Sequence, residues 1–262
     1  FAVSFLVKKQ PDGTYDDSNR DLGLNRSHQL VLSYDTYLAR FWGIKANAYV
    51  SYNTNFAVDK VSNSFSIVNH GNFAVYPDST GLISNGEGLN YGVEISIEKY
   101  FSKGFYGLLS TAYQRSLYHG SDRVWRRSAF DAQHVTSLVM GKEFKIGKEK
   151  QNVIYGDFRF NLHGGLPYTP IDLEASKLAG KEVLVEDEAY SEQLGLYKRI
   201  DVRIGARFNH RRKRISHHIF IVVQNVAAFR NDFAVRYNPS TEEIVRAQQF
   251  GLIPNLFYQV HF

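Results

Sequence analysis

Segments in which apolar and polar side chains alternate residue by residue dominate the sequence. The clearest covers residues 200–208. Its apolar face consists of Ile200, Val202, Ile204, Ala206 and Phe208, and its polar face consists of Asp201, Arg203, Gly205 and Arg207. Successive side chains of a β-strand point to opposite sides, so such a segment forms a strand with one apolar and one polar face. Strands of this kind build membrane-spanning barrels, with the apolar face toward lipid.

We predict an all-β, antiparallel transmembrane β-barrel fold with ten strands in this chain. Two of them, 105–119 and 215–227, carry apolar residues on both faces and are predicted from length and β-propensity. One short helix is expected at 173–180, inside a connection. The ten predicted strands are 1–9, 27–38, 41–53, 90–101, 105–119, 133–146, 151–164, 197–209, 215–227 and 252–262.

The connections between these strands alternate strictly between short and long. The short ones are 39–40, 102–104, 147–150 and 210–214, and the long ones are 10–26, 54–89, 120–132, 165–196 and 228–251. Up-and-down barrels of the outer membrane have this asymmetry, with short turns on the periplasmic side and long loops outside. A soluble sandwich has no reason to sort its connections in this way.

The composition agrees with a barrel and excludes several other classes. Mean hydropathy is −0.32, and we find no apolar run of about 18 residues, so a helical membrane span is excluded. The chain has no cysteine, which excludes disulfide scaffolds and thiolate metal sites. Its net charge of +5 is mild, and we expect no nucleic-acid partner. The basic run 211–214 is interpreted as a solvated turn.

Aromatic residues make up 15% of the chain and gather at strand ends. Tyr37, Phe41 and Trp42 flank one short turn, and further rings flank the others. Aromatic side chains at the membrane–water boundary place an apolar body in lipid and a polar tip in water. The final residue, Phe262, closes an alternating strand and is similar to the terminal aromatic signal of barrel assembly.

Charged residues on the polar faces of the strands are expected to face the barrel lumen. A charge facing lipid at mid-membrane costs about 2–4 kcal/mol, which makes the lumen the favourable side. The predicted lumen-facing residues are Lys45, Glu94, Glu98, Asp157, Arg159, Asp201, Arg203 and Arg207.

Several short motifs, in order and spacing, resemble the C-terminal part of the barrel of a TonB-dependent receptor of the type common in Bacteroidetes. They are 25–34 (NRSHQLVLSY), 86–95 (GEGLNYGVEI), 98–104 (EKYFSKG), 140–144 (MGKEF), 164–172 (GGLPYTPID), 197–201 (YKRID) and 224–226 (QNV).

This resemblance implies a 22-stranded barrel in the outer membrane of a Gram-negative bacterium, filled by an N-terminal plug domain. The implied function is nutrient uptake energised by the TonB system through the plug. The implied partners are outer-membrane lipid and, as a further possibility, a surface lipoprotein or an outer-membrane complex. The chain begins at Phe1 without a signal segment, so we expect residues 1–262 to be the C-terminal part of a barrel without its plug and first strands.

Two alternatives stay open at this point: a structural, receptor-like subunit of a larger outer-membrane assembly, and a small omptin-like barrel protease. The protease hypothesis draws on His119 and His134, which bracket a connection containing Asp122 and Asp131. We find no convincing nucleophile motif or cofactor fingerprint and expect no catalytic, cofactor-binding or metal-binding residues. The adjacent His217 and His218 point to opposite faces of a strand and cannot hold one ion from one side.

Connections 54–89, 165–196 and 228–251 are the expected sites of ligand capture, because binding residues concentrate on long loops over a rigid scaffold. Connection 165–196 carries seven acidic residues against two lysines, a net charge of −5 on a basic chain. This charge disfavours anionic ligands and favours a neutral or cationic one, such as a glycan or a peptide. The alternative is that the acids only keep a long loop solvated.

Overall fold

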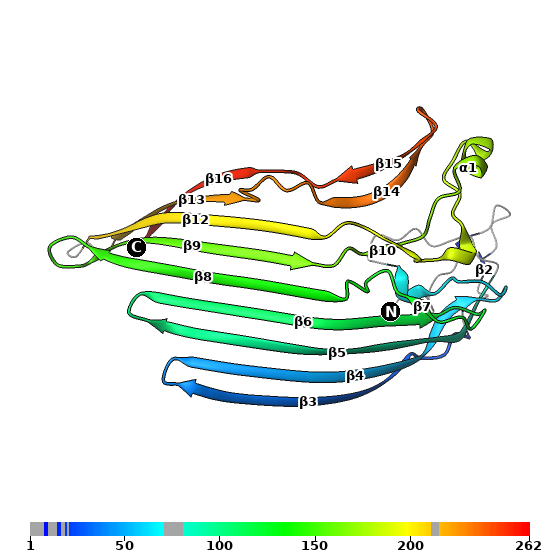
Figure 1. Cartoon of the computed structure of the whole chain (residues 1–262), viewed down its shortest axis with the longest axis horizontal. Helices are drawn as coiled ribbons and strands as arrows, with labels where there is room; N and C mark the ends of the chain where they lie inside the picture. The colour runs from blue at the N-terminus through cyan, green and yellow to red at the C-terminus, as the bar shows by residue number, and fades with distance from the viewer. Residues whose placement is uncertain (1–7, 10–14, 17–18, 20, 71–80, 211–214) are drawn as a thin grey trace.

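The computed structural model describes residues 8–9, 15–16, 19, 21–70, 81–210 and 215–262. Ten strands of this part form one antiparallel sheet, in which neighbours along the chain are neighbours in space (Figure 1). In sheet order its nine long strands are β3 (Arg26–Ala39), β4 (Trp42–Asp59), β5 (Leu82–Ser102), β6 (Phe105–His119), β8 (His134–Ile146), β9 (Asn152–His163), β12 (Tyr197–His210), β13 (Ile215–Gln224) and β16 (Ile253–His261). The tenth, β7 (Arg126–Arg127), pairs with β6.

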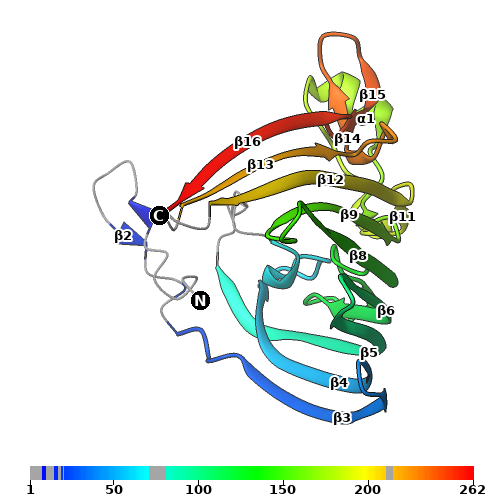
Figure 2. The same cartoon turned by 90° about the vertical axis from the view of Figure 1, so that its left-hand side faces the viewer.

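Nine of the predicted strands coincide with these nine long strands. The remaining predicted strand, 1–9, lies largely outside the described residues. Its last two residues form β1 (Lys8–Lys9), which pairs with β2 (Tyr15–Asp16) in a separate sheet. Within the described residues, β3 and β16 each have one sheet partner, so the sheet is a curved wall with two edges (Figure 2).

Short turns lie at one end of the wall and long connections at the other (Figure 1). The long connections are folded. They contain the hairpin β14–β15 (Asp232–Asn238 and Glu243–Gln248), the small β10–β11 sheet (Pro167–Tyr168 and Glu192–Gln193) and α1 (Leu173–Ala179), which matches the predicted helix. The expected loop 228–251 is therefore largely a strand hairpin.

Strands β4 and β5 extend beyond their predicted ends, so the expected loop 54–89 shrinks to 60–81. The cause is an irregularity at Asn55, which has a φ of 66° and breaks the pairing register between Thr54 and Ala57. An extra residue in one strand flips the side chains beyond it to the other face. The period-two pattern fails there although the strands continue.

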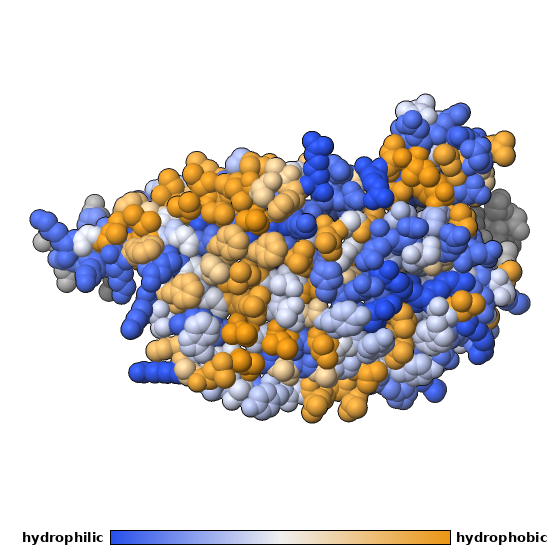
Figure 3. Space-filling view, viewed as in Figure 1, coloured by the Kyte–Doolittle hydropathy of each residue, from blue (hydrophilic) through white to orange (hydrophobic). Residues whose placement is uncertain are grey.

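The sheet exposes a broad apolar surface on its convex side. Ile204 is 61% exposed and Leu256 is 69% exposed, and both belong to the apolar faces recognised in the sequence. Apolar side chains spread over the strands toward the short turns, and polar ones prevail toward the long connections (Figure 3).

The total accessible surface is 17353 Å², against about 11,700 Å² for a compact protein of this mass. The apolar cluster of buried residues lies instead at the long-connection end. It consists of Ala57 and Leu82, with Leu22, Phe65 and Ile67 packed against them. None of the helices in the described ranges has the length and hydropathy needed to cross a membrane.

An arginine on the apolar face of β12 should block insertion into lipid. We expect Ile204→Arg to destabilise the inserted state by about 2–4 kcal/mol, because its side chain would meet hydrocarbon. Arg207→Leu, on the opposite face of the same strand, serves as the matched control and should leave insertion nearly intact. Folding into lipid vesicles, followed by gel mobility, measures both. Equal tolerance of the two changes would contradict the two-faced assignment of β12.

Candidate functional site

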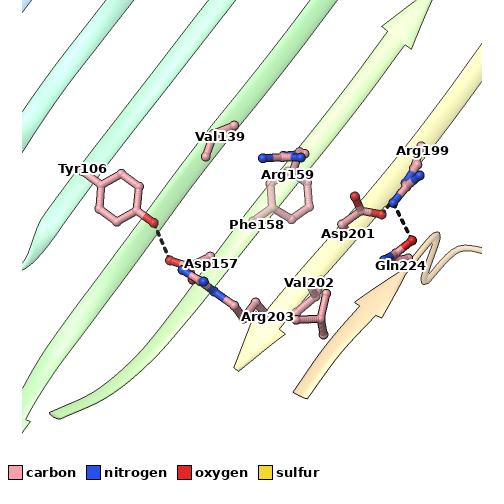
Figure 4. Close-up of a pocket in the computed structure, with 11 residues that line it drawn as sticks. Tyr106, Val139, Asp157, Phe158, Arg159, Arg199, Asp201, Val202, Arg203 and Gln224 are labelled. Atoms are coloured by element: carbon pink, nitrogen blue, oxygen red, sulfur yellow. Dashed lines mark hydrogen bonds and ion pairs between the residues drawn. The ribbon is translucent and has the colours of Figure 1, made fainter. Parts of the chain in front are cut away.

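Three side chains, from strands β6, β9 and β12, meet on the polar face of the wall. The carboxylate of Asp157 on β9 accepts hydrogen bonds from Arg203 Nε on β12, at 2.5 Å, and from the Tyr106 hydroxyl on β6, at 2.6 Å (Figure 4). Asp157 and Arg203 are direct partners in the strand register. A charge-assisted hydrogen bond of this kind stabilises the pairing register of the two strands.

A second polar contact fixes the long-connection end of the same wall. Arg199 Nε donates to Asp201 at 2.7 Å, and its other nitrogen donates to Gln224 on β13 at 2.9 Å (Figure 4). Asp201 also accepts the backbone N–H of Asn225, whose φ is 50°. The motifs 197–201 and 224–226 therefore act together, because they lock the start of β12 to the end of β13.

A shallow groove of 340 Å³ runs along this part of the polar face. Besides six side chains already described, it is lined by Arg159 and by apolar groups from β8, β9, β12 and β13. Its charged side chains have both signs. The groove can contact a polar protein surface of mixed charge, but it has no single-sign ring that would select ions.

Tyrosines on the polar face cover glycines of neighbouring strands. A Cβ atom at Gly205 would lie 2.5 Å from the Tyr155 hydroxyl and 2.6 Å from Phe220, and a Cβ at Gly92 would lie 2.8 Å from the Tyr49 hydroxyl. Both are direct cross-strand pairs. The absence of a side chain lets the ring lie flat over the backbone, which compensates for the packing that a glycine in a strand lacks.

The register places all eight predicted lumen residues on one face of the sheet. Lys45 lies 3.7 Å from Asp35, Glu94 accepts a hydrogen bond from Ser110 at 3.1 Å, and Arg207 lies 4.0 Å from Glu143. Asp157, Asp201 and Arg203 make the contacts described above. Glu98 and Arg159 make no ion pair with another residue in the described ranges. That this face is the lumen of a closed barrel stays a prediction, as does the role of Phe262 in assembly.

A second candidate site lies among the long connections, where a cavity of 520 Å³ opens between residues 59–70 and residues 169–190. Two rings, Phe65 and Tyr190, and two carboxylates, Asp59 and Glu186, lie in its wall. The other lining residues are Asn63, Ser64, Ser66, Asn69, His70, Thr169, Leu184 and Ala189. No lysine or arginine of the described residues lines this cavity, which we call the loop cavity.

The chemistry of the loop cavity is mostly neutral. Burial, with a smaller contribution from Glu186, raises the pKa of Tyr190 to about 12, so its phenol stays protonated at neutral pH. Burial also lowers the pKa of His70 and favours the neutral imidazole. The hydroxyl of Ser66 is buried without a hydrogen-bond partner among the described residues. Such a wall offers hydroxyls, amides and rings to an uncharged polar ligand.

The acidic residues of connection 165–196 divide into two groups. Asp172 caps α1 by accepting the N–H of Ala175, and Glu182 accepts from Arg236 and from the backbone of Tyr237 on β14. Those two carboxylates therefore have structural partners. Asp187 and Glu188 are exposed and form no ion pair within the described ranges, so the unpaired negative charge gathers beside the loop cavity.

Asp131 and His119, two residues of the protease hypothesis, form ion pairs with other side chains. Asp131 is fully buried and accepts Arg115 Nε at 3.2 Å and Arg127 Nε at 2.8 Å, while His119 Nε2 lies 3.4 Å from Glu87. The paired histidines contact different tyrosines: His217 meets Tyr258, and His218 meets Tyr155. No group of three or more metal-ligating side chains occurs within the described residues.

No protein-family model matches the sequence, and no curated protein is similar to it at a significant level. The fold does match solved structures. One is the ferric yersiniabactin uptake receptor FyuA from Yersinia pestis, with a TM-score of 0.60 and 15% identity, over 91% of this chain. The matched region is 30% of the FyuA chain. OmpT of Vibrio cholerae aligns over 89% of this chain and 57% of its own, with 9% identity and a TM-score of only 0.33.

The fold is that of an outer-membrane β-barrel wall. The likeness to FyuA carries this statement, together with the antiparallel up-and-down topology and the exposed apolar face. At 15% identity the comparison supports a statement about the fold alone. The chain spans less than a third of the length of the receptor that it matches.

A side chain at Gly205 should weaken the polar wall. Gly205→Ala would push a methyl group against Tyr155 and Phe220, and we expect a loss of about 1–3 kcal/mol in stability. Gly156→Ala is the matched control, because a Cβ there would lie 4.0 Å from the backbone oxygen of Arg203, its nearest neighbour on another strand. Urea unfolding in lipid measures both, and an equal effect of the two substitutions would contradict the tyrosine-over-glycine packing.

Proposed function

We propose that this chain forms part of the barrel of an outer-membrane receptor that takes up a nutrient by a TonB-dependent mechanism. The polar face with its interstrand ion pairs carries the proposal. It provides a wall of mixed charge, suited to hold a polar plug domain inside a barrel. The fold likeness to an uptake receptor and the motif resemblance support the same function. The proposal includes no covalent chemistry: the barrel binds and admits a ligand, and the energy comes through the plug.

The ligand is a neutral or cationic molecule, such as a glycan or a peptide, captured at the loop cavity. The cavity has two rings and many hydroxyl and amide groups, but no basic side chain among the described residues. Asp187 and Glu188 add negative charge at its side. A multiply anionic chelate would therefore be repelled by these carboxylates as it approaches, and no basic side chain of the described residues would bind it in the cavity.

Energy dependence tests the receptor function directly. In cells that carry the intact protein, uptake of the ligand should stop when the TonB energy transducer is deleted, while binding at the cell surface should persist. A passive pore would keep its uptake in the deletion strain, and a purely structural subunit would show neither binding nor uptake. Either result would contradict the proposal.

Charge neutralisation tests the ligand class. In the variant Glu186→Gln, Asp187→Asn, Glu188→Gln, an anionic probe should associate several-fold faster at low salt, because the repulsion is removed. A neutral oligosaccharide probe should associate at an unchanged rate. The control is Glu242→Gln with Glu243→Gln on the β14–β15 hairpin. Tight binding of a multiply anionic chelate that neutralisation leaves unchanged would refute the electrostatic argument.

A structural role in an outer-membrane assembly is the second candidate. The β14–β15 hairpin and its flanks expose Phe233 at 69% and Phe250 at 89%, and α1 exposes Leu178 at 92%. Apolar side chains gathered on one projecting lobe favour a protein partner, such as a surface lipoprotein (Figure 3). Co-purification of a stoichiometric partner without any ligand uptake would support this candidate over the receptor.

A further inference from the structure

Basic and aromatic side chains surround a hollow at the short-turn end of the sheet. The hollow has a volume of 550 Å³ and lies between the β5–β6 turn and the end of β8. Its wall contains Lys103, Lys142 and Lys145, with Phe101 and Phe144 beside them. We call these five residues the basic rim. It lies at the opposite end of the sheet from the loop cavity.

All three lysines of the basic rim line the hollow, and the side chain of Lys142 is held there by a hydrogen bond. Lys142 Nζ donates to the backbone carbonyl of Lys103 at 2.9 Å and lies 5.8 Å from the centre of the Phe144 ring. Glu143 is the one acidic residue that lines the hollow, and its carboxylate lies 4.0 Å from Arg207. None of the three lysines forms an ion pair within the described residues.

The aromatic members of the basic rim join it to the lipid-facing surface. Phe101 and Phe144 are 55% and 56% exposed. Phe144 pairs in register with Ile154, which is 43% exposed on the apolar face of β9. A molecule with a phosphate among the lysines would therefore have an apolar surface beside it on which to lay a hydrocarbon chain.

Further pairs of cations and aromatic rings lie at the neighbouring short turn, between β3 and β4. Lys99 Nζ lies 5.2 Å from the ring centre of Phe41 and 5.9 Å from that of Trp42, and the Arg40 guanidinium lies 5.2 Å from Phe41. Cations alternating with rings at one height match the boundary between phospholipid headgroups and hydrocarbon. The hollow is the point on this boundary where three cations converge.

We propose that the basic rim binds an anionic phospholipid, with the headgroup phosphate between Lys103 and Lys142 and an acyl chain against Phe101 and Phe144. Two features favour a lipid over free phosphate. The hollow is open to the apolar face, and its cations are partly exposed, so that phosphate alone would stay largely hydrated. The inference uses the outer-membrane placement proposed above but not the transport function.

Lipid retention on the intact protein tests this site. The protein is purified in detergent, mixed with phosphatidylglycerol or phosphatidylcholine of the same chain length, and examined by native mass spectrometry. We expect clear preference for phosphatidylglycerol, reduced about 25-fold in Lys103→Gln with Lys142→Gln, because each basic residue at an anionic lipid surface contributes about fivefold. Lys103→Arg with Lys142→Arg keeps the charge and should keep the preference.

The control is Lys148→Gln with Lys150→Gln, two lysines of a neighbouring short turn that do not line the hollow. An equal loss in the control would overturn the site in favour of general surface charge. Equal retention of the two lipids, or displacement of phosphatidylglycerol by inorganic phosphate at the same concentration, would also overturn it. Membrane fractionation separates this failure from that of the proposed function. A protein found outside the outer membrane contradicts the placement, whereas a correctly placed protein without lipid preference contradicts only the basic rim.

Discussion

The rest of the structure depends on the register of the antiparallel ladder. In lipid every backbone N–H and C=O must find a partner in the sheet, and a slip of one residue would turn every polar side chain outward. Strand β12 is pinned against such a slip at both ends. Asp201 accepts the N–H of Asn225 at one end, and Asn152 accepts the N–H of Asn209 at the other, each at 2.9 Å. With the register fixed, Arg203 lies beside Asp157 and Ile204 faces the opposite side.

The alternation of side chains is sufficient to predict seven of the nine long strands of the sheet, and length with β-propensity predicts the other two, β6 and β13. Together they also predict the sorting of short and long connections. The prediction is wrong where the strands depart from regular alternation. The irregularity at Asn55 interrupts the period-two rule, so the outer parts of β4 and β5 were expected to be loop. The β14–β15 hairpin projects beyond the wall. Phe233, Val235 and Tyr237 alternate with polar or small residues in β14, but the seven residues of β14 and the six of β15 are fewer than the ~10 of a membrane-spanning strand. Both segments therefore fall within an expected loop.

The candidate site was predictable in one respect only, the face on which its charges lie. Period-two parity within one strand is enough to place Asp201, Arg203 and Arg207 together. The partners could not be predicted, because they come from distant segments: Asp157 is 46 residues from Arg203 and 51 from Tyr106. The tyrosine-over-glycine packing and the loop cavity also depend on which strands and loops become neighbours, and a single sequence carries no direct signal for that.

Apolar side chains are placed differently in the sheet and in the long connections. Along the wall, apolar and polar side chains are sorted onto opposite faces of the sheet, and the described strands have few buried apolar residues. At the long-connection end the protein builds a small apolar cluster of the ordinary kind, in which Phe65 packs against Ala57 and Leu82. Phe65 also lines the loop cavity, so the shape of that cavity is set by packing among the loops. We therefore expect substitutions on the cavity wall to alter the proposed ligand capture without disturbing the register of the sheet, and substitutions at the basic rim to alter the proposed lipid contact without affecting the cavity.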